Sequence, residues 1–158
     1  MPRKEREPAI PNLQLNHPPS PDLQNWTPRP KPERRVLEGR CVILHPIDAN
    51  LHSDGLYEAS TMSDADSRFR WLSEYPPASR GELQPWLQNA QASEDPLFFA
   101  VIDKASKKVA GRQSLMRMDP KFGVIEIGHI YWSSLIACTP AATEAQYLFQ
   151  KYVLQELG

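Results

Sequence analysis

The segment at residues 123–145 holds the residues of this chain whose types and spacing best suit a chemical role. It is expected to run from a strand through a loop into a helix that Thr139 caps and Pro140 opens. The first turn of a helix leaves backbone N–H groups free, and the helix dipole favours negative charge there. Small side chains at this point let a ligand approach the backbone, and the sequence supplies four: Ala137, Cys138, Ala141 and Ala142. The segment therefore predicts a place to hold a phosphate group.

Glu126 is the candidate general base of the same segment. On a strand over residues 124–132, period-two alternation gives it a face shared with Gly128 and with apolar residues, namely Val124, Ile130 and Trp132. Apolar surroundings would make its carboxylate a better proton acceptor near neutral pH. The alternative interpretation is an ion pair across a hairpin with Arg117 or Arg112.

His129 is the second titratable residue of this strand. Alternation places it on the face opposite Glu126, with Ile125, Ile127 and Tyr131. It could relay a proton, or it could be a structural histidine with satisfied hydrogen bonds.

The composition narrows the function classes. A chain of 158 residues is expected to form one domain, and its net charge of −1 gives no basic field for nucleic acid. Cys41 and Cys138 lack the spacing of a metal site and indicate free thiols, while the four histidines form no ligand motif, so no metal is expected. No apolar run approaches a membrane span, and the first residues lack the apolar core of a signal peptide. These features predict a cytoplasmic protein without a membrane partner.

The first 35 residues differ from the rest. Nine of the sixteen prolines lie in the first 32 residues, without hydrophobic periodicity. Residues 1–35 are therefore expected to be a disordered or extended Pro-rich tail, and residues 36–158 the folded domain. The motif at residues 28–32 (PRPKP) could dock on an SH3-like groove, although a solvated linker is the simpler interpretation.

Hydrophobic periodicity predicts the elements that must position these residues. The expected strands are 40–46, 97–102, 108–118 and 124–132, of which the last three form an antiparallel meander. The expected helices are 49–60, capped by Asp48, then 80–93 and 140–157, with residues 61–80 irregular. The predicted fold class is α+β, an antiparallel meander sheet flanked by helices.

This order of elements resembles the GCN5-related N-acetyltransferases (GNAT), and in particular their RimJ/RimL-like branch. The residues that carry the resemblance are Ala110-Gly111, Ile125-Glu126-Ile127-Gly128, and Ala142-Thr143-Glu144-Ala145. It covers residues 36–158. It implies acetyl transfer from acetyl-CoA to a primary amine, either a protein N-terminus or a small molecule. Transfer is then expected to be direct, without a covalent acyl-enzyme, and Glu126 is the candidate to accept the proton of the attacking amine.

The resemblance also implies where acetyl-CoA would bind. The strand at 124–132 would contact the pantetheine arm through the backbone of Ile130, Tyr131 and Trp132. The following loop and helix start would hold the pyrophosphate through Ala137, Cys138, Thr139, Ala141, Ala142 and Thr143. Trp71, Tyr75 and Trp86 fall in the region that shapes the acceptor site of this family, and are expected in the core rather than on the acceptor.

The sequence departs from the family pattern at two points. The loop before the last helix has neither glycine nor arginine, and Cys138 stands where a basic side chain is expected. The family domain continues with further strands and a helix, so this domain is expected to be C-terminally truncated and its sheet incomplete.

An incomplete sheet leaves a second hypothesis open. The chain could be a non-catalytic remnant of the family or an interaction module that uses its Pro-rich tail. The strand at 124–132 would then be an exposed edge, which favours homo-association through strand pairing.

Overall fold

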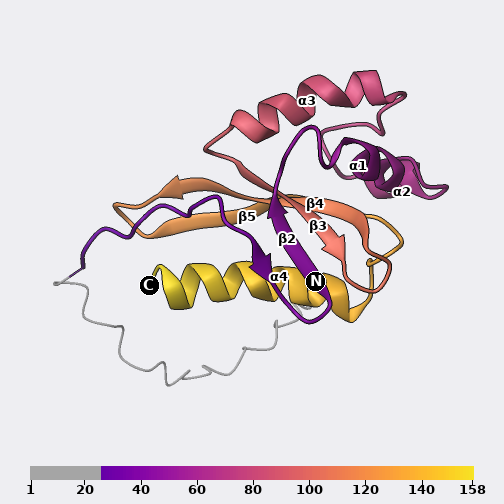
Figure 1. Ribbon diagram of the computed structural model, residues 1–158. Helices are drawn as coiled ribbons and strands as arrows, with labels where there is room; N and C mark the ends of the chain where they lie inside the picture. Colours follow the sequence, from indigo (N-terminus) through magenta and orange to yellow (C-terminus); the bar gives the residue numbers. More distant parts are fainter. Residues whose placement is uncertain (1–25) are drawn as a thin grey trace, which may run out of the picture.

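The computed structural model describes residues 26–158 and shows one antiparallel sheet with helices on both faces (Figure 1). Its five strands lie in chain order: β1 (Leu37–Glu38), β2 (Val42–Pro46), β3 (Leu97–Asp103), β4 (Lys108–Asp119) and β5 (Val124–Trp132). One face carries α1 (Ser53–Ser60), α2 (Ala65–Phe69) and α3 (Arg80–Ala92). The other carries α4 (Pro140–Lys151), which continues as a π-helical turn, η1 (Tyr152–Glu156). The predicted α+β class and meander are confirmed.

The helix predicted from residue 49 begins four residues later, at Ser53. Asp48 does not cap it. Its carboxylate instead accepts the backbone N–H groups of Asn50 (2.9 Å) and Leu51 (2.8 Å) and so closes a turn in front of the helix. This side-chain turn competes with the helix, as short polar side chains often do.

Three further details differ from the prediction. β1 was not expected, and α2 lies in the segment expected to be irregular. The last helix changes its hydrogen bonding at Tyr152, where the predicted helix was continuous to residue 157. All three elements are short, and their apolar residues pack against distant parts of the chain, which local periodicity does not report.

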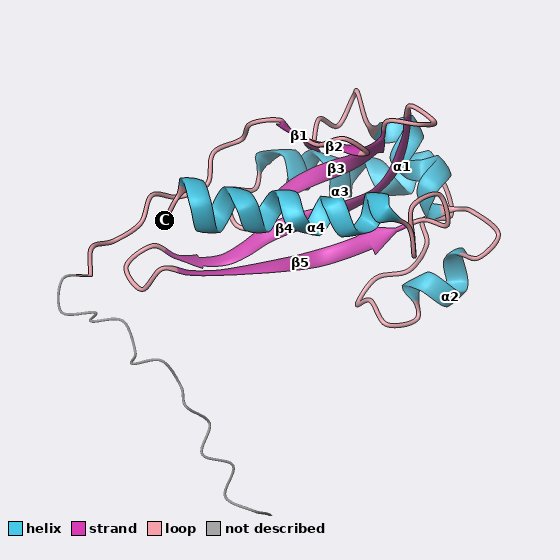
Figure 2. Ribbon diagram, turned by 90° about the horizontal axis from the view of Figure 1, so that it is seen from below, coloured by secondary structure: helices cyan, strands magenta, loops and turns pink. Residues whose placement is uncertain are grey.

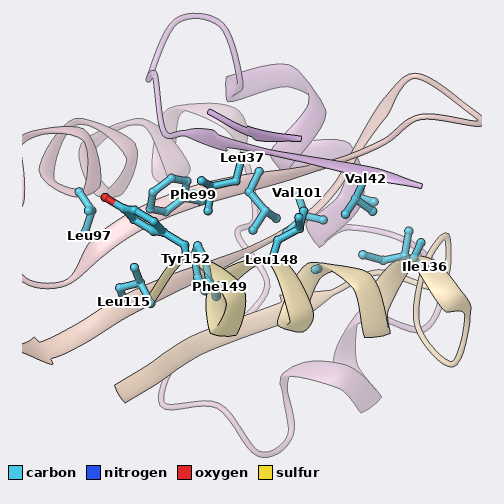
Figure 3. Packing of buried hydrophobic residues seen from close by; sticks show 14 residues of the cluster. Leu37, Val42, Leu97, Phe99, Val101, Leu115, Ile136, Leu148, Phe149 and Tyr152 are labelled. Carbon is cyan, nitrogen blue, oxygen red and sulfur yellow. The ribbon is translucent and has the colours of Figure 1, made fainter. Parts of the chain in front are cut away.

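The core between the sheet and α4 is the largest of the three buried hydrophobic clusters. Figure 3 shows its side chains. Phe99 of β3 and Phe149 of α4 are fully buried, and their rings meet edge to face with centroids 5.0 Å apart. Ile136, in the loop before α4, is also fully buried in this layer. The loop is therefore anchored from beneath, which sets the position of the helix start. On the opposite face, Leu56 of α1 and Leu87 of α3 pack against the sheet.

A β-bulge interrupts β5 near its centre. Ser114 pairs with Gly128 but Arg112 pairs with Tyr131, so β5 has one residue more than β4 between these pairs. His129 lies at the bulge with a φ of 48°, in the left-handed region that costs a non-glycine residue about 1 kcal/mol. The extra residue reverses the alternation of side chains beyond it.

The faces predicted for β5 are therefore wrong beyond residue 128. Trp132 lies with Ile125 and Ile127 against the α4 layer rather than on the face of Glu126. His129 lies on the other face, where its ring packs on Phe98 with centroids 5.1 Å apart. A strict period of two could not locate this inserted residue.

The described part of the Pro-rich segment, residues 26–35, has no helix or strand but does contact the domain. The Trp26 indole donates to the Lys121 carbonyl (2.8 Å), and the Arg29 N–H donates to the Pro120 carbonyl (3.0 Å). Pro30 and Pro32 line an apolar hollow beside β5 and η1. Residues 1–25 of the tail predicted for residues 1–35 lie outside the described residues, and the domain border at residue 36 stays a prediction.

Candidate functional site

The end of β5 lies beside the first turn of α4 (Figure 2). Two hollows meet there at Trp132, the last residue of β5. Eight of the nine residues predicted to bind the cofactor line them: Ile130, Tyr131, Trp132, Ala137, Cys138, Thr139, Ala142 and Thr143. The ninth, Ala141, is buried in the layer beneath α4. We call this pair of hollows the Trp132 groove. The structure thus brings together the residues that sequence analysis grouped.

The loop from residue 133 to residue 139 shapes the groove. Ser133 fixes its start, because both its N–H (2.9 Å) and its hydroxyl (2.8 Å) donate to the Ala110 carbonyl. The Thr139 N–H donates to the Ile136 carbonyl (3.0 Å) and closes the loop over the buried Ile136. Cys138 has a φ of 61°, the conformation that glycine adopts most easily. The loop therefore makes its turn without the glycine that the family pattern contains.

The start of α4 has free backbone donors, one of them on a residue that lines the groove, Ala142. The Thr139 hydroxyl donates to the Ile136 carbonyl (2.6 Å) instead of capping the helix, and Pro140 has no N–H. The amides of Ala141 and Ala142 consequently have no hydrogen-bond acceptor among the described residues. Such amides at a helix start favour an anion.

Trp132 is held in place from both sides of the sheet. Its indole N–H donates to the Gln113 side chain (3.3 Å), and the Gln113 amide in turn donates to the Ala145 carbonyl of α4 (3.0 Å). The Trp132 carbonyl accepts a hydrogen bond from the side chain of Arg68, in the last turn of α2 (3.4 Å). Gln113 is fully buried, so this network links β4, β5 and α4 through a rigid polar contact.

Tyr131 contributes its backbone and its ring to the Trp132 groove, and its hydroxyl does not serve as an acid there. Its buried hydroxyl donates to the Ala59 carbonyl (2.8 Å). Burial raises the pKa of Tyr131 to about 12, so the hydroxyl stays protonated at neutral pH. Gly111 on β4 allows the close approach of the two strands here, because a Cβ at that position would lie 2.1 Å from the Tyr131 carbonyl oxygen.

Arg40 is a groove residue that sequence analysis missed. It comes from the turn between β1 and β2, and its side chain is 96% exposed at the rim of the Trp132 groove. The loop at residues 133–139 has no basic side chain, but the β1–β2 turn brings the positive charge of Arg40 to the same groove. About a hundred residues separate Arg40 from the loop, so no local motif could reveal it.

Glu144 connects that turn to α4. Its carboxylate accepts the backbone N–H groups of Arg40 (2.9 Å), Cys41 (2.5 Å) and Val42 (3.0 Å). Burial alone would raise the pKa of Glu144, but these backbone hydrogen bonds outweigh it and lower the pKa below its usual value. Gly39 leaves the space for the carboxylate, since a Cβ there would lie 2.5 Å from Glu144.

Glu126 lies in surroundings that differ from the expected ones. Its side chain is 47% exposed, and its Oε2 accepts a hydrogen bond from Arg117 Nη1 at 3.0 Å. The expectation of an apolar neighbourhood is thus wrong, because the position lies toward the hairpin end of β5, about 20 Å along the strand from Trp132. The structure shows the ion pair across the hairpin that was the alternative interpretation. The catalytic role of Glu126 stays a prediction.

A second polar cluster lies on the face of α1, α2 and α3. Arg112 Nη2 donates to Glu74 Oε2 at 2.6 Å, and Glu74 Oε1 lies 3.7 Å from His129 Nδ1. The Arg112 guanidinium also lies 4.3 Å from the centroid of the Trp86 ring. Burial lowers the pKa of Arg112, and the neighbouring Glu74 carboxylate opposes this shift. Glu74 lies in an irregular stretch and carried no sequence signal.

Trp71, Tyr75 and Trp86, which the family resemblance assigned to the acceptor region, do not share one environment. Trp71 and Tyr75 are 87% and 90% exposed, so their expected place in the core is wrong. Trp86 is partly buried against Phe98 and the α1–α3 layer.

Within residues 26–158 no three metal-ligating side chains gather into a cluster. None of the helices in this part of the chain has the length and apolarity needed to cross a bilayer.

The structure is that of an α+β protein with a groove at one end of an antiparallel sheet. A GCN5-related N-acetyltransferase from Brucella melitensis is similar to it, with 65% sequence identity, a TM-score of 0.85, and a match over 86% of this chain and 62% of that one. A GNAT-family protein from Chromobacterium violaceum ATCC 12472 is 30% identical, with a TM-score of 0.77, over 96% of this chain and 72% of that one.

This chain belongs to the GNAT family. It spans 62% of the length of the Brucella melitensis protein. No protein-family model and no curated protein sequence matches it.

Proposed function

We propose that this protein takes part in acetyl transfer from acetyl-CoA to a primary amine, and that the Trp132 groove is its acetyl-CoA site. The observation that carries this proposal is the groove itself, where free amides at a helix start and small side chains meet the end of β5. Bound acetyl-CoA would supply an activated acetyl group.

The residues present fit the anionic part of such a ligand. The amides of Ala141 and Ala142 have no acceptor among the described residues, and the small residues Ala142 and Cys138 line the groove beside them, which favours a phosphate oxygen there. Glu144 lines the same hollow, but its carboxylate is occupied by three backbone N–H groups. Arg40 adds positive charge at the rim. The backbone of Ile130, Tyr131 and Trp132 would hold the pantetheine arm.

Two finer assignments complete the proposal. We assign the chain to the RimJ/RimL-like branch on its sequence motifs, and we keep Glu126 as the predicted base. β5 is the last strand of the sheet among the described residues, so pairing of two copies along this edge also stays a prediction.

Calorimetric titration of acetyl-CoA into the purified chain tests the site. We expect binding, and we expect Arg40→Gln to weaken it by about three- to tenfold, because an exposed charge contributes modestly in water. Higher salt should reduce that difference. Arg80→Gln is the matched control, since Arg80 pairs with Asp54 on the opposite face of the sheet and should leave the affinity unchanged.

Absence of binding would contradict the proposal and favour the non-catalytic alternative. Equal effects of the two substitutions would show that Arg40 has no special role at the groove. Where the chain turns over an amine, Glu126→Gln should lower the rate, and an unchanged rate across pH would remove Glu126 from the mechanism.

A further inference from the structure

A further hollow lies on the face of α1, α2 and α3, and Arg112 is one of the residues that line it. Its walls come from the ends of α1 and α2, from the segment before α3 and from α3 itself, and include Ser60, Phe69, Glu74, Tyr75 and Trp86. We call it the Arg112 hollow. The Arg112 side chain is only 6% exposed, yet its Nη1 has no hydrogen-bond acceptor among the described residues. A buried guanidinium N–H left without a partner is costly, so a ligand oxygen placed there would be favoured.

The surrounding groups fix the direction of this unpaired donor. Glu74 binds the other amino group, Nη2, at 2.6 Å, and the Trp86 ring lies against the guanidinium with 4.3 Å between centroid and Cζ. An arginine held by an ion pair and an aromatic ring keeps its remaining donors in a fixed plane. Nη1 is therefore preorganised for an incoming acceptor atom.

The charges around the Arg112 hollow limit which chemical group of a ligand can accept the hydrogen bond from Arg112 Nη1. Glu74 already balances the charge of Arg112, and Glu82 adds a second carboxylate to the wall. The Glu82 carboxylate accepts the Ala78 N–H at 2.8 Å and so is held in place by the backbone. An incoming carboxylate would face this surplus of negative charge, whereas an uncharged oxygen would not. An ammonium group would be attracted to it.

We infer that the Arg112 hollow binds an amine that carries an uncharged carbonyl oxygen, with Arg112 Nη1 donating to that oxygen and the carboxylates of Glu74 and Glu82 attracting the amine. The ligand class is an α-amino carboxamide rather than a free amino acid. Two aromatic residues of the lining, Phe69 and Trp86, would pack against its apolar atoms.

The Arg112 hollow lies where the amine that accepts the acetyl group would have to bind, next to the Trp132 groove. Arg112 is the register partner of Tyr131, and Tyr131 lines the Trp132 groove. His129, at the bulge beside this pair, lies 3.7 Å from Glu74. As an acceptor site the hollow rests on the proposed function, but the binding itself does not require acetyl-CoA.

The test compares the binding of glycinamide with that of glycine. Glycinamide carries an uncharged carboxamide where glycine carries a negatively charged carboxylate. Each is titrated to tens of millimolar, at constant ionic strength, into the full chain labelled with 15N. Contacts of so few atoms predict dissociation constants on the order of millimolar. We expect glycinamide to shift the Trp86 indole and Arg112 guanidinium signals, and glycine to bind about tenfold more weakly or not at all.

Arg112→Lys is the matched variant, because lysine keeps the charge beside Glu74 but has no second amino group to replace Nη1. It should weaken glycinamide binding by about tenfold. Arg117→Lys is the control, since Arg117 forms the exposed ion pair with Glu126 and lies outside the hollow. If Arg112→Lys does not fold, the guanidinium shifts of Arg112 and Arg117 in the unmodified chain decide the question.

Glycine binding as tightly as glycinamide, or glycinamide shifting Arg117 rather than Arg112, would overturn the inference. No shift with either compound would overturn it as well. Calorimetry with acetyl-CoA on the same sample separates the two proposals. Retained acetyl-CoA binding with an unresponsive hollow refutes this inference alone, and the converse refutes the acetyl-CoA site alone.

Discussion

His52 shows how one buried residue couples the fold to pH. Its ring is 1% exposed, and Nδ1 accepts the Asp48 N–H at 3.0 Å. Nε2 has no partner among the described residues. Burial, and then the neighbouring His45, lower the pKa of His52 to about 4, so the folded protein keeps this imidazole neutral well below pH 6. The unfolded chain would take up the proton near pH 6.5.

We therefore expect stability to fall as the pH drops from about 6.5 toward 4, because only the unfolded state binds the proton in that range. Between pH 7 and pH 5 this one group should cost about 2 kcal/mol. Urea unfolding at the two pH values measures the loss. His52→Gln should flatten the dependence, and a variant with the same pH slope as the unmodified chain would show that other groups cause it.

At the scale of elements, two contacts place the groove. The bulge in β5 turns Trp132 toward α4, and Glu144 fastens the β1–β2 turn to the first turns of the same helix. The Glu144 contact brings Arg40 to the groove, so the basic rim depends on a carboxylate that lies largely hidden beneath it.

Glu144→Gln tests the second contact. A glutamine side chain has one acceptor oxygen and no charge for the three N–H groups of residues 40–42, so we expect a loss of about 1–3 kcal/mol in the free energy of unfolding. Glu38→Gln is the control, because Glu38 is exposed and its ion pair with Lys104 should contribute less than about 1 kcal/mol.

The pH dependence supplies a second measurement for Glu144. Its pKa is lowered in the folded state, so its contribution is present above the unfolded pKa near 4.5 and is lost as the pH falls through the folded value. The difference between the unmodified chain and Glu144→Gln should therefore shrink in acid. Equal losses for the Glu144 and Glu38 variants at neutral pH would refute the special role of Glu144.

At the scale of the whole molecule, residues 26–35 tie distant parts together. They cross from the β4–β5 hairpin to η1, where the Tyr152 hydroxyl accepts the Glu33 N–H at 2.8 Å and Arg35 pairs with Glu156. The Arg35 guanidinium also lies 4.1 Å from the centroid of the Tyr152 ring. These contacts cover apolar side chains of β5 and η1.

A chain that begins at residue 36 should consequently be less stable than one that begins at residue 26. We expect its melting temperature to be lower by about 4 °C or more, since each kcal/mol lost shifts the midpoint by several degrees in a domain of this size. Thermal unfolding of the two chains at equal concentration measures the difference. Equal midpoints would place the border of the folded unit at residue 36, as the sequence predicts.

The sequence by itself determined the elements that depend on local chemistry. β5 and the start of α4 lie where the apolar pattern and the Thr139-Pro140 pair predicted them, and α3 follows its helical spacing. The grouping of small residues at the helix start also follows from sequence, because neighbours along the chain stay neighbours in a turn. Local periodicity and capping chemistry are enough for such features.

Only the tertiary structure decided which side chains meet across the sheet. The bulge at His129 changed the faces of β5, and a single inserted residue leaves no mark in the hydrophobic pattern. Arg40 reaches the groove, and Glu74 reaches Arg112, through contacts between segments far apart in the chain. Such contacts arise from how layers pack, so the composition of the groove rim and of the Arg112 hollow could not be predicted from spacing alone.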